Sequence, residues 1–249
     1  MKAITQLHQK LINSVGPLNG KSVLDYGCGR GDMIELLLHI SNGPQMIFAV
    51  DSNEEFIRGI ETRFGNAIGT KKLFTQTCSN PYDLVKHRFD IIFCHNVLEC
   101  VADKQKFVKD IFHLLKPGGI LLLSHHDFDS VIYNSEFKEL TRNLVHCFAD
   151  TKQDWQANHD GQMGRKIPGI FARANVKNAT FEIWRMVENS YDSGDYGFLM
   201  SKMILDVCKN QFSKHELDLW RQDLESKAKN KDYYFAIDVV VAKAVENNE

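Results

Sequence analysis

The stretch VLDYGCGRGD, residues 23–32, decides the fold of this chain. A short apolar run contains one carboxylate, Asp25, and glycine follows at Gly27, Gly29 and Gly31. Glycines in the turn between a strand and the next helix let backbone amides approach a ligand closely, at the point where a doubly wound sheet binds nucleotides. The stretch therefore predicts the first strand and the ligand-binding turn of an α/β domain.

The carboxylates around this turn indicate the kind of ligand. Asp25 lies two residues before the first glycine, where a carboxylate would repel a pyrophosphate and attract an α-amino group. Asp51, 20 residues after Gly31 and at the end of the second predicted strand, is placed to accept hydrogen bonds from both hydroxyls of a ribose. S-adenosylmethionine meets these demands, because it joins an amino acid group to a nucleoside.

Short apolar runs alternate with segments of helical period over residues 20 to about 126, which is typical of a parallel sheet with helices on both faces. The five predicted strands are KSVLDYG, QMIFAVD, KLFTQT, RFDIIFCH and GGILLLSHH. Each is nearly continuous in apolar residues, as burial on both faces requires. Ser52 and Glu55 predict a capping box before the helix that follows the second strand. An amphipathic N-terminal helix is expected within residues 1–19, outside the main sheet.

The pattern changes after the fifth strand. Residues 127–176 are polar and of helical period, and they predict a helical cap inserted at this point. Two further strands, ATFEIWRMVENSY and DYYFAIDVVVAKA, enclose two helices, the second of which opens with Ser213 and Glu216 as a capping box. No internal repeat or linker appears, so we expect a single domain over residues 1–249.

Composition and charge bound the class of protein. The chain has 249 residues and a formal net charge of -2, with no long block of like charge, so we expect no nucleic-acid partner. No apolar run approaches the roughly 18 residues that a membrane span needs, and the N-terminus lacks the apolar core of a signal peptide. We therefore expect a cytoplasmic protein without membrane association, as a monomer or homodimer. The six cysteines form no C-x-x-C pair and the ten histidines no zinc spacing, so we expect reduced thiols and no metal.

Four stretches, VLDYGCGRGD, AVDSN, FDIIFCHNVLECVAD and LLKPGGILLLS, resemble the successive motifs of class I S-adenosylmethionine-dependent methyltransferases, in order and over residues 20–126. The later stretch FSKHELDLWRQDLESKAKNKDYYFAIDVVVAKA resembles the closing helix and strand of the branch that methylates small molecules. The resemblance implies a Rossmann-like, doubly wound sheet of seven strands, whose last strand is antiparallel and lies between the fifth and the sixth.

The resemblance also assigns residues to the cofactor. It implies that the glycine turn wraps the methionine moiety, that the ribose is held at the end of the second strand, and that Ser52 and Phe56 flank the adenine. Many relatives carry an acid after the third strand, where this chain has Cys78, so either Ser79 or Asn80 replaces that contact or adenine is held by stacking and backbone amides. The predicted cofactor residues are Asp25, Gly27, Cys28, Gly29, Gly31, Asp51, Ser52, Phe56, Cys78, Ser79 and His95.

Methyl transfer needs an aligned nucleophile, exclusion of water and, where the nucleophile carries a proton, a group to accept it. His125 and His126 come at the predicted end of the fifth strand, and alternation along a strand lets only one of them face the methyl group. We predict His126 as the proton acceptor, since histidine titrates near neutral pH. The alternative for His126 is a capping or surface histidine.

The predicted cap supplies candidate substrate residues. Trp155 and Arg165 lie within it, and Tyr191 lies in the polar loop after the sixth strand. Together these features predict an S-adenosylmethionine-dependent methyltransferase that acts on a small molecule, with S-adenosylhomocysteine as product and with the acceptor atom, N, O or C, left open. The alternatives are a methyltransferase of protein or RNA and a non-catalytic S-adenosylmethionine-binding protein. The G-x-G-x-G pattern and Asp25 argue against a nicotinamide-dependent dehydrogenase.

Overall fold

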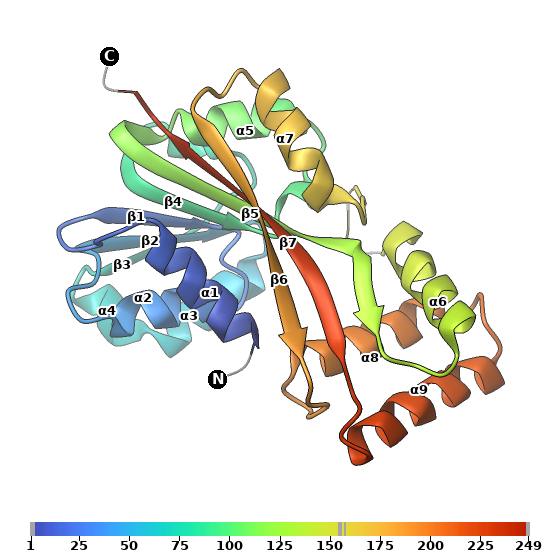
Figure 1. The fold of residues 1–249 in the computed structure, drawn as a ribbon. Helices are drawn as coiled ribbons and strands as arrows, with labels where there is room; N and C mark the ends of the chain where they lie inside the picture. Colours follow the sequence, from blue (N-terminus) through green and yellow to red (C-terminus); the bar gives the residue numbers. More distant parts are fainter. Residues whose placement is uncertain (1–2, 154–155, 157, 248–249) are drawn as a thin grey trace. The chain divides into compact units, whose positions relative to one another are not determined.

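The computed structural model describes residues 3–153, 156 and 158–247 of the chain. Seven strands form one sheet in the order β3-β2-β1-β4-β5-β7-β6, and β7 runs antiparallel to its neighbours (Figure 1). The strands are β1 (Ser22–Tyr26), β2 (Met46–Asp51), β3 (Leu73–Thr77), β4 (Phe89–His95), β5 (Leu115–Tyr133), β6 (Ala179–Glu188) and β7 (Phe235–Val245). The predicted Rossmann-like fold, with its antiparallel last strand between the fifth and the sixth, is confirmed.

Helices connect the strands in the described part of the chain. They are α1 (Ala3–Ser14), α2 (Asp32–His39), α3 (Glu54–Arg63), α4 (Gly65–Gly69), α5 (Lys104–Phe112), α6 (Lys138–Asp150), α7 (Met163–Arg173), α8 (Tyr196–Cys208) and α9 (Lys214–Lys229), with short 3-10 turns η1 (Pro81–Leu84) and η2 (Leu98–Cys100). The helices α6 and α7 lie between β5 and β6 in the sequence, at the predicted insertion. No helix in the described ranges is long and apolar enough to cross a membrane.

The chain divides into two compact units. The first unit comprises residues 8–125, 167–182 and 241–249, and the second comprises residues 1–7, 126–166 and 183–240. The first unit therefore contains β1 to β4 and the glycine turn, whereas the second contains α6, α8 and α9.

Burial of β1 on both faces organises the first unit. β1 pairs in parallel with β2 on one side and with β4 on the other, and Val23 and Leu24 are completely buried. The ring of Phe107 on α5 packs edge-on against Tyr26, with 5.3 Å between ring centroids. Side chains alternate between the two buried faces of the strand, so the apolar run of residues 23–26 is interrupted by a single carboxylate, Asp25.

Hydrogen bonds of buried aromatic side chains join elements of the second unit. Trp220 of α9 is completely buried and its indole N–H donates to Oγ1 of Thr141 on α6 at 3.0 Å. The Tyr133 hydroxyl at the end of β5 donates to the Gly197 carbonyl in the first turn of α8 at 2.8 Å. The predicted capping box of Ser213 and Glu216 at the start of α9 is confirmed.

Two local predictions were wrong. The cap of α3 is Asn53, whose side chain accepts from the N–H of Glu55 at 2.8 Å, in place of the predicted Ser52 box. The fifth strand extends to Tyr133 and does not end near residue 126. Residues about 100 positions further along the chain hold this extension in place, because the N–H of Asn134 donates to the carbonyl of Tyr234 beside β7.

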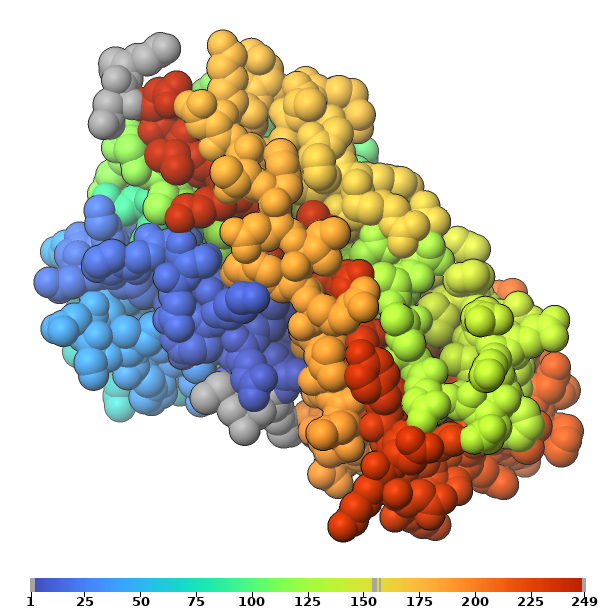
Figure 2. All heavy atoms as spheres, viewed as in Figure 1, coloured from blue at the N-terminus to red at the C-terminus, as the bar shows by residue number. Residues whose placement is uncertain are grey.

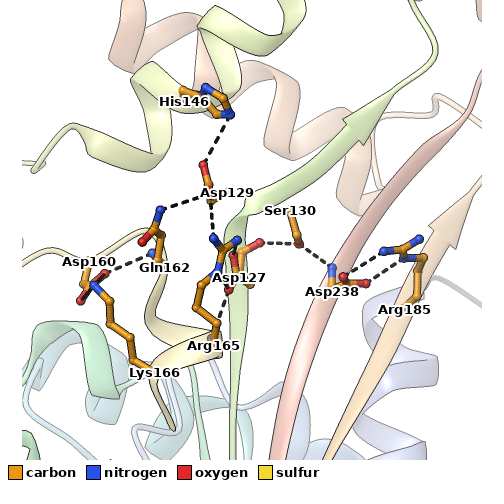
Figure 3. Close-up of polar contacts among 10 residues, drawn as sticks. All are labelled: Asp127, Asp129, Ser130, His146, Asp160, Gln162, Arg165, Lys166, Arg185 and Asp238. Atoms are coloured by element: carbon orange, nitrogen blue, oxygen red, sulfur yellow. Dashed lines mark hydrogen bonds and ion pairs between the residues drawn. The ribbon is translucent and has the colours of Figure 1, made fainter. Parts of the chain in front are cut away.

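Strand β6 lies at an edge of the described sheet, with β7 as its strand neighbour, and its atoms run along the face shown in orange in Figure 2. Ile183 and Val187 are 68% and 50% exposed there. Between them, Arg185 forms a bidentate ion pair with Asp238 of β7, with its shortest contact at 2.7 Å (Figure 3). A charged residue on an edge strand disfavours pairing with a further strand.

Candidate active site

The glycine turn follows β1 directly and leads into α2. All three glycines have positive φ angles, +77° at Gly27, +51° at Gly29 and +84° at Gly31. At Gly27 a Cβ atom would lie 2.1 Å from Cγ2 of Val97. The glycine turn and the residues after β4 therefore lie too close together for a side chain at position 27. The N–H groups of Gly27 and Cys28 both donate to the Val50 carbonyl, at 2.8 and 3.0 Å, and anchor the turn on β2.

The side chain of Asp51 links the glycine turn to the loop between β2 and α3. One carboxylate oxygen accepts from the N–H of Gly29 at 2.9 Å and the other accepts from the N–H of Asn53 at 2.9 Å. The carbonyl of Asp51 accepts from the N–H of Cys78 at 2.8 Å, which brings the end of β3 to the same place. The predicted ribose residue and the glycine turn are therefore assembled at the carboxyl ends of three neighbouring parallel strands.

Asp25 is a buried carboxyl group in which one oxygen atom is unsatisfied within the described part of the chain. Its side chain is 4% exposed, and its Oδ2 atom is buried with no hydrogen-bond partner among the described residues. Burial, reinforced by the negative charges of Asp51 and Asp32, raises the pKa of Asp25 to about 7. Burial also raises the pKa of the nearby Cys28 thiol, with Asp25 and Asp51 adding to the shift. A buried acceptor with an unmatched oxygen favours a ligand that brings a cationic donor.

This raised pKa leads to a test of the folded protein without ligand. Because the pKa of Asp25 is higher in the folded state than the usual 3.8, the folded form loses stability as the pH rises through about 7. We expect Asp25→Asn to raise the free energy of unfolding above pH 8 by up to about 4 kcal/mol, and by little at pH 4. We also expect this variant to bind S-adenosylhomocysteine more weakly. Denaturant unfolding at both pH values and calorimetry check the two effects, and a pH-independent difference in stability would contradict the assignment.

A cluster of polar side chains lies at the carboxyl end of β4. Nδ1 of His95 is 2.8 Å from Oγ of Ser124, with which it shares a hydrogen bond. The ring of His8 from α1 meets His95 edge-on, with 5.5 Å between ring centroids, and burial lowers the pKa of His8 against the opposing effect of Asp32. The sequence analysis predicted His95 as a site residue but not His8. The one sequence feature that could have indicated His8 is its position beside the apolar stripe of α1.

Comparison with known proteins bears on this strand-turn-helix site. A family model described as a methyltransferase domain matches residues 18–175, which include the glycine turn, Asp51 and all of β1 to β5. The chain belongs to this methyltransferase domain family. The family predicted from the four motifs is thus confirmed.

A curated relative and two solved structures are similar to this chain. A ubiquinone biosynthesis O-methyltransferase of Coxiella burnetii is 32% identical over 146 residues, which are 57% of this chain and 60% of that protein. The chain thus spans about 60% of the length of this curated relative. The YcgJ protein of Bacillus subtilis has a TM-score of 0.57 at 17% identity, with 98% of this chain and 99% of that chain covered. A phosphoethanolamine N-methyltransferase 2 of Haemonchus contortus, in complex with phosphomonomethylethanolamine and S-adenosylhomocysteine, has a TM-score of 0.55 at 16% identity, over 98% of this chain and 53% of that chain.

The residues predicted for adenine lie at two loops of the methyltransferase domain. Ser52 is exposed and Phe56 half-buried at the start of α3. Cys78 is 4% exposed, and its thiol lies 3.1 Å from the Asn80 carbonyl, to which it donates. Ser79 lines a cavity of about 260 Å³ together with Asn80 and residues of α5. All of these positions belong to the first unit, as do the glycine turn and His95.

Among the other predicted residues, His126, Arg165 and Tyr191 belong to the second unit. His126 is completely buried, with its ring stacked on Tyr196 at a centroid distance of 5.0 Å and its Nε2 atom 3.4 Å from Sδ of Met186. The Tyr191 hydroxyl is 2.8 Å from Oγ of Ser201. Trp155 lies outside the described residues.

Arg165 lies in the polar cluster that Figure 3 shows beside β5. Its guanidinium binds both carboxylate oxygens of the buried Asp127 and also contacts Asp129 at 3.1 Å. The backbone N–H of Arg165 donates to the Asp127 carboxylate as well, at 3.1 Å. Arg165 thus has a clear structural partner, and its predicted role in substrate binding stays a prediction.

We expect Arg165→Ala to reduce stability more than it reduces cofactor affinity. Its loss leaves Asp127, whose side chain is 4% exposed, without its counter-charge, and removal of one partner from a buried pair costs about 3–5 kcal/mol. The exposure of Arg165 itself, 48%, places the expected loss at the lower end of that range. Thermal unfolding and S-adenosylhomocysteine calorimetry of the same sample check this. Unchanged stability together with reduced turnover would instead favour the substrate role.

Proposed function

We propose that this chain is an S-adenosylmethionine-dependent methyltransferase that acts on a small molecule in the cytoplasm. The observation that carries the proposal is the buried Asp25, whose Oδ2 atom has no hydrogen-bond partner among the described residues and lies just before a turn that no side chain can enter at Gly27. The methionine ammonium of the cofactor supplies the cationic donor that Asp25 lacks.

The remaining groups of the first unit fit the rest of the cofactor. Each carboxyl oxygen of Asp51 accepts one backbone hydrogen bond, from Gly29 or from Asn53, so each oxygen retains capacity for a ribose hydroxyl. Ser52, Phe56, Cys78 and Ser79 are the residues proposed beside the adenine. When bound, S-adenosylmethionine supplies an activated methyl group.

For an acceptor that carries a proton, a histidine of this chain takes it. Two histidines are candidates: His126, in its enclosure of Tyr196 and Met186, and His95, whose ring is oriented by Ser124. A pair of variants, His126→Gln and His95→Gln, separates them, because replacement of the histidine that accepts the proton abolishes turnover. His95 is also predicted to line the cofactor, so turnover of both variants is compared at saturating S-adenosylmethionine.

Two observations support a small-molecule acceptor. The net charge of -2 offers no general attraction for nucleic acid, and the relative from Coxiella burnetii is named as an O-methyltransferase of ubiquinone biosynthesis. A cytoplasmic site of action agrees with six cysteines that are all free thiols.

The test has two steps. Calorimetry of the full chain with S-adenosylmethionine, S-adenosylhomocysteine and NAD is expected to give saturable binding of the first two and none of the third. A tritiated-methyl transfer screen against fractionated extract of the source cell then identifies the acceptor, with label expected in a small-molecule fraction. Binding of NAD alone contradicts the cofactor, and label that appears in protein or RNA contradicts the substrate class.

A further inference from the structure

A cavity of about 280 Å³ lies within the second unit, between the outer half of β5 and the helix α6. Its floor is apolar, with Val131 and Tyr133 of β5 at 7% and 6% exposure. Its rim on the helix side is formed by Lys138, Arg142 and His146. None of the residues that line this cavity belongs to the glycine turn or its partners, so the cavity is separate from the proposed cofactor site.

The rim places three basic side chains in one row. Lys138, Arg142 and His146 are spaced by four residues, which puts them on one face of a helix, and all three are exposed. Like charges at this spacing destabilise a helix by a few tenths of a kcal/mol per pair. Lys138 and Arg142 form one such pair of like charges, and an anion beside them offsets their repulsion.

The acid on the opposite wall, Asp129, has polar partners of its own, although it shares the Arg165 guanidinium with Asp127. Asp129 contacts the Arg165 guanidinium at 3.1 Å, accepts from the Gln162 amide at 3.2 Å and lies 3.6 Å from Nε2 of His146 (Figure 3). By contrast, Lys138 and Arg142 form no ion pair in the described part of the chain. The charge of Lys138 acts on neighbouring Glu136, which is itself bonded to Lys227. Two cationic groups at the mouth of the cavity are thus available to a ligand.

We propose that this cavity binds the anionic group of a small molecule, a carboxylate or a phosphate, through Arg142 and Lys138. The apolar part of the ligand lies against Val131 and Tyr133. The volume is slightly below that of drug-sized sites, so the ligand is a compact one, such as a single-ring acid or a small phosphomonoester. Arg142 supplies paired donors in the planar geometry that carboxylates and phosphates accept, and Lys138 adds a second charge at the first turn of α6.

The test uses the full chain and two simple probes, inorganic phosphate and benzoate. Each is titrated at an ionic strength of about 0.15 M, where non-specific surface attraction is largely screened, and amide shifts are followed by NMR. We expect saturable binding of at least one probe, with the largest shifts in residues 129–146. Arg142→Gln and Lys138→Gln are each expected to weaken it about tenfold. The control Lys214→Gln removes an exposed lysine from α9 and is expected to change nothing.

The outcomes distinguish a phosphate ligand from a carboxylate ligand. They also distinguish failure of this proposal from failure of the proposed cofactor site. Binding of phosphate alone identifies a phosphate ligand, and binding of benzoate alone identifies a carboxylate with an apolar body. Binding of neither probe, shifts spread over the whole surface, or an equal loss in Lys214→Gln overturns the proposal. S-adenosylhomocysteine is titrated into the same samples, so that failure of the cofactor site is recorded independently of failure at the cavity between β5 and α6.

Discussion

Gly27→Ala is expected to abolish S-adenosylhomocysteine binding and to lower the stability of the first unit. The new Cβ atom would lie 2.1 Å from Cγ2 of Val97, at a φ angle of +77° that an L-residue adopts only at a cost. The left-handed conformation costs roughly 1–2 kcal/mol, and overpacking adds roughly 1–3 kcal/mol. Any shift that relieves the overlap moves the turn away from its bonds to Val50. Calorimetry and thermal unfolding measure the two losses.

Gly29→Ala is the matched control for this variant. Gly29 also has a positive φ angle, +51°, but a Cβ atom there would meet nothing within 4 Å. We expect it to incur the conformational cost alone and to remain folded and able to bind the ligand with reduced affinity. If both variants lose the same stability and affinity, the requirement for glycine at position 27 comes from the positive φ angle. The close approach of Val97 would then contribute nothing to that requirement.

Asp51→Ala is expected to weaken cofactor binding by more than a hundredfold. Two hydrogen bonds from ribose hydroxyls to a charged acceptor contribute roughly 1.5–3 kcal/mol each, so their loss exceeds about 3 kcal/mol. The variant also removes the carboxylate that accepts from Gly29 and Asn53, which loosens the turn before any ligand arrives. Calorimetry with S-adenosylhomocysteine measures the effect.

The control for Asp51 is Glu54→Ala, which removes a nearby exposed carboxylate whose one ion pair among the described residues is with Arg58, at 3.2 Å. Its affinity is expected to equal that of the wild type, because a surface ion pair of this kind contributes little. A folded Asp51→Ala protein with unchanged affinity would rule out the ribose assignment.

Local chemistry explains which parts of this site could be predicted from sequence. The glycine turn and Asp51 were predictable because a tight turn and a strand end each have a recognisable sequence pattern within a few residues. The length of β5 was not, since its last residues are held by β7, about 100 positions further along the chain. The pairing of Asp127 with Arg165, across 38 residues, leaves no local signal either, and it turned a predicted substrate residue into one with a structural partner.

The position of β7 in the sheet has a consequence during synthesis on the ribosome. β7 follows every other strand of the described sheet along the chain, yet it lies between β5 and β6. Until it emerges, both of these strands expose an unpaired edge, and such edges are sites of aggregation in nascent chains. The first five strands can pair as they appear, so the nascent protein is expected to carry an open, half-finished sheet until its last strand inserts. Chaperone dependence of this protein is therefore expected to fall sharply once residues 235–245 have emerged from the ribosome.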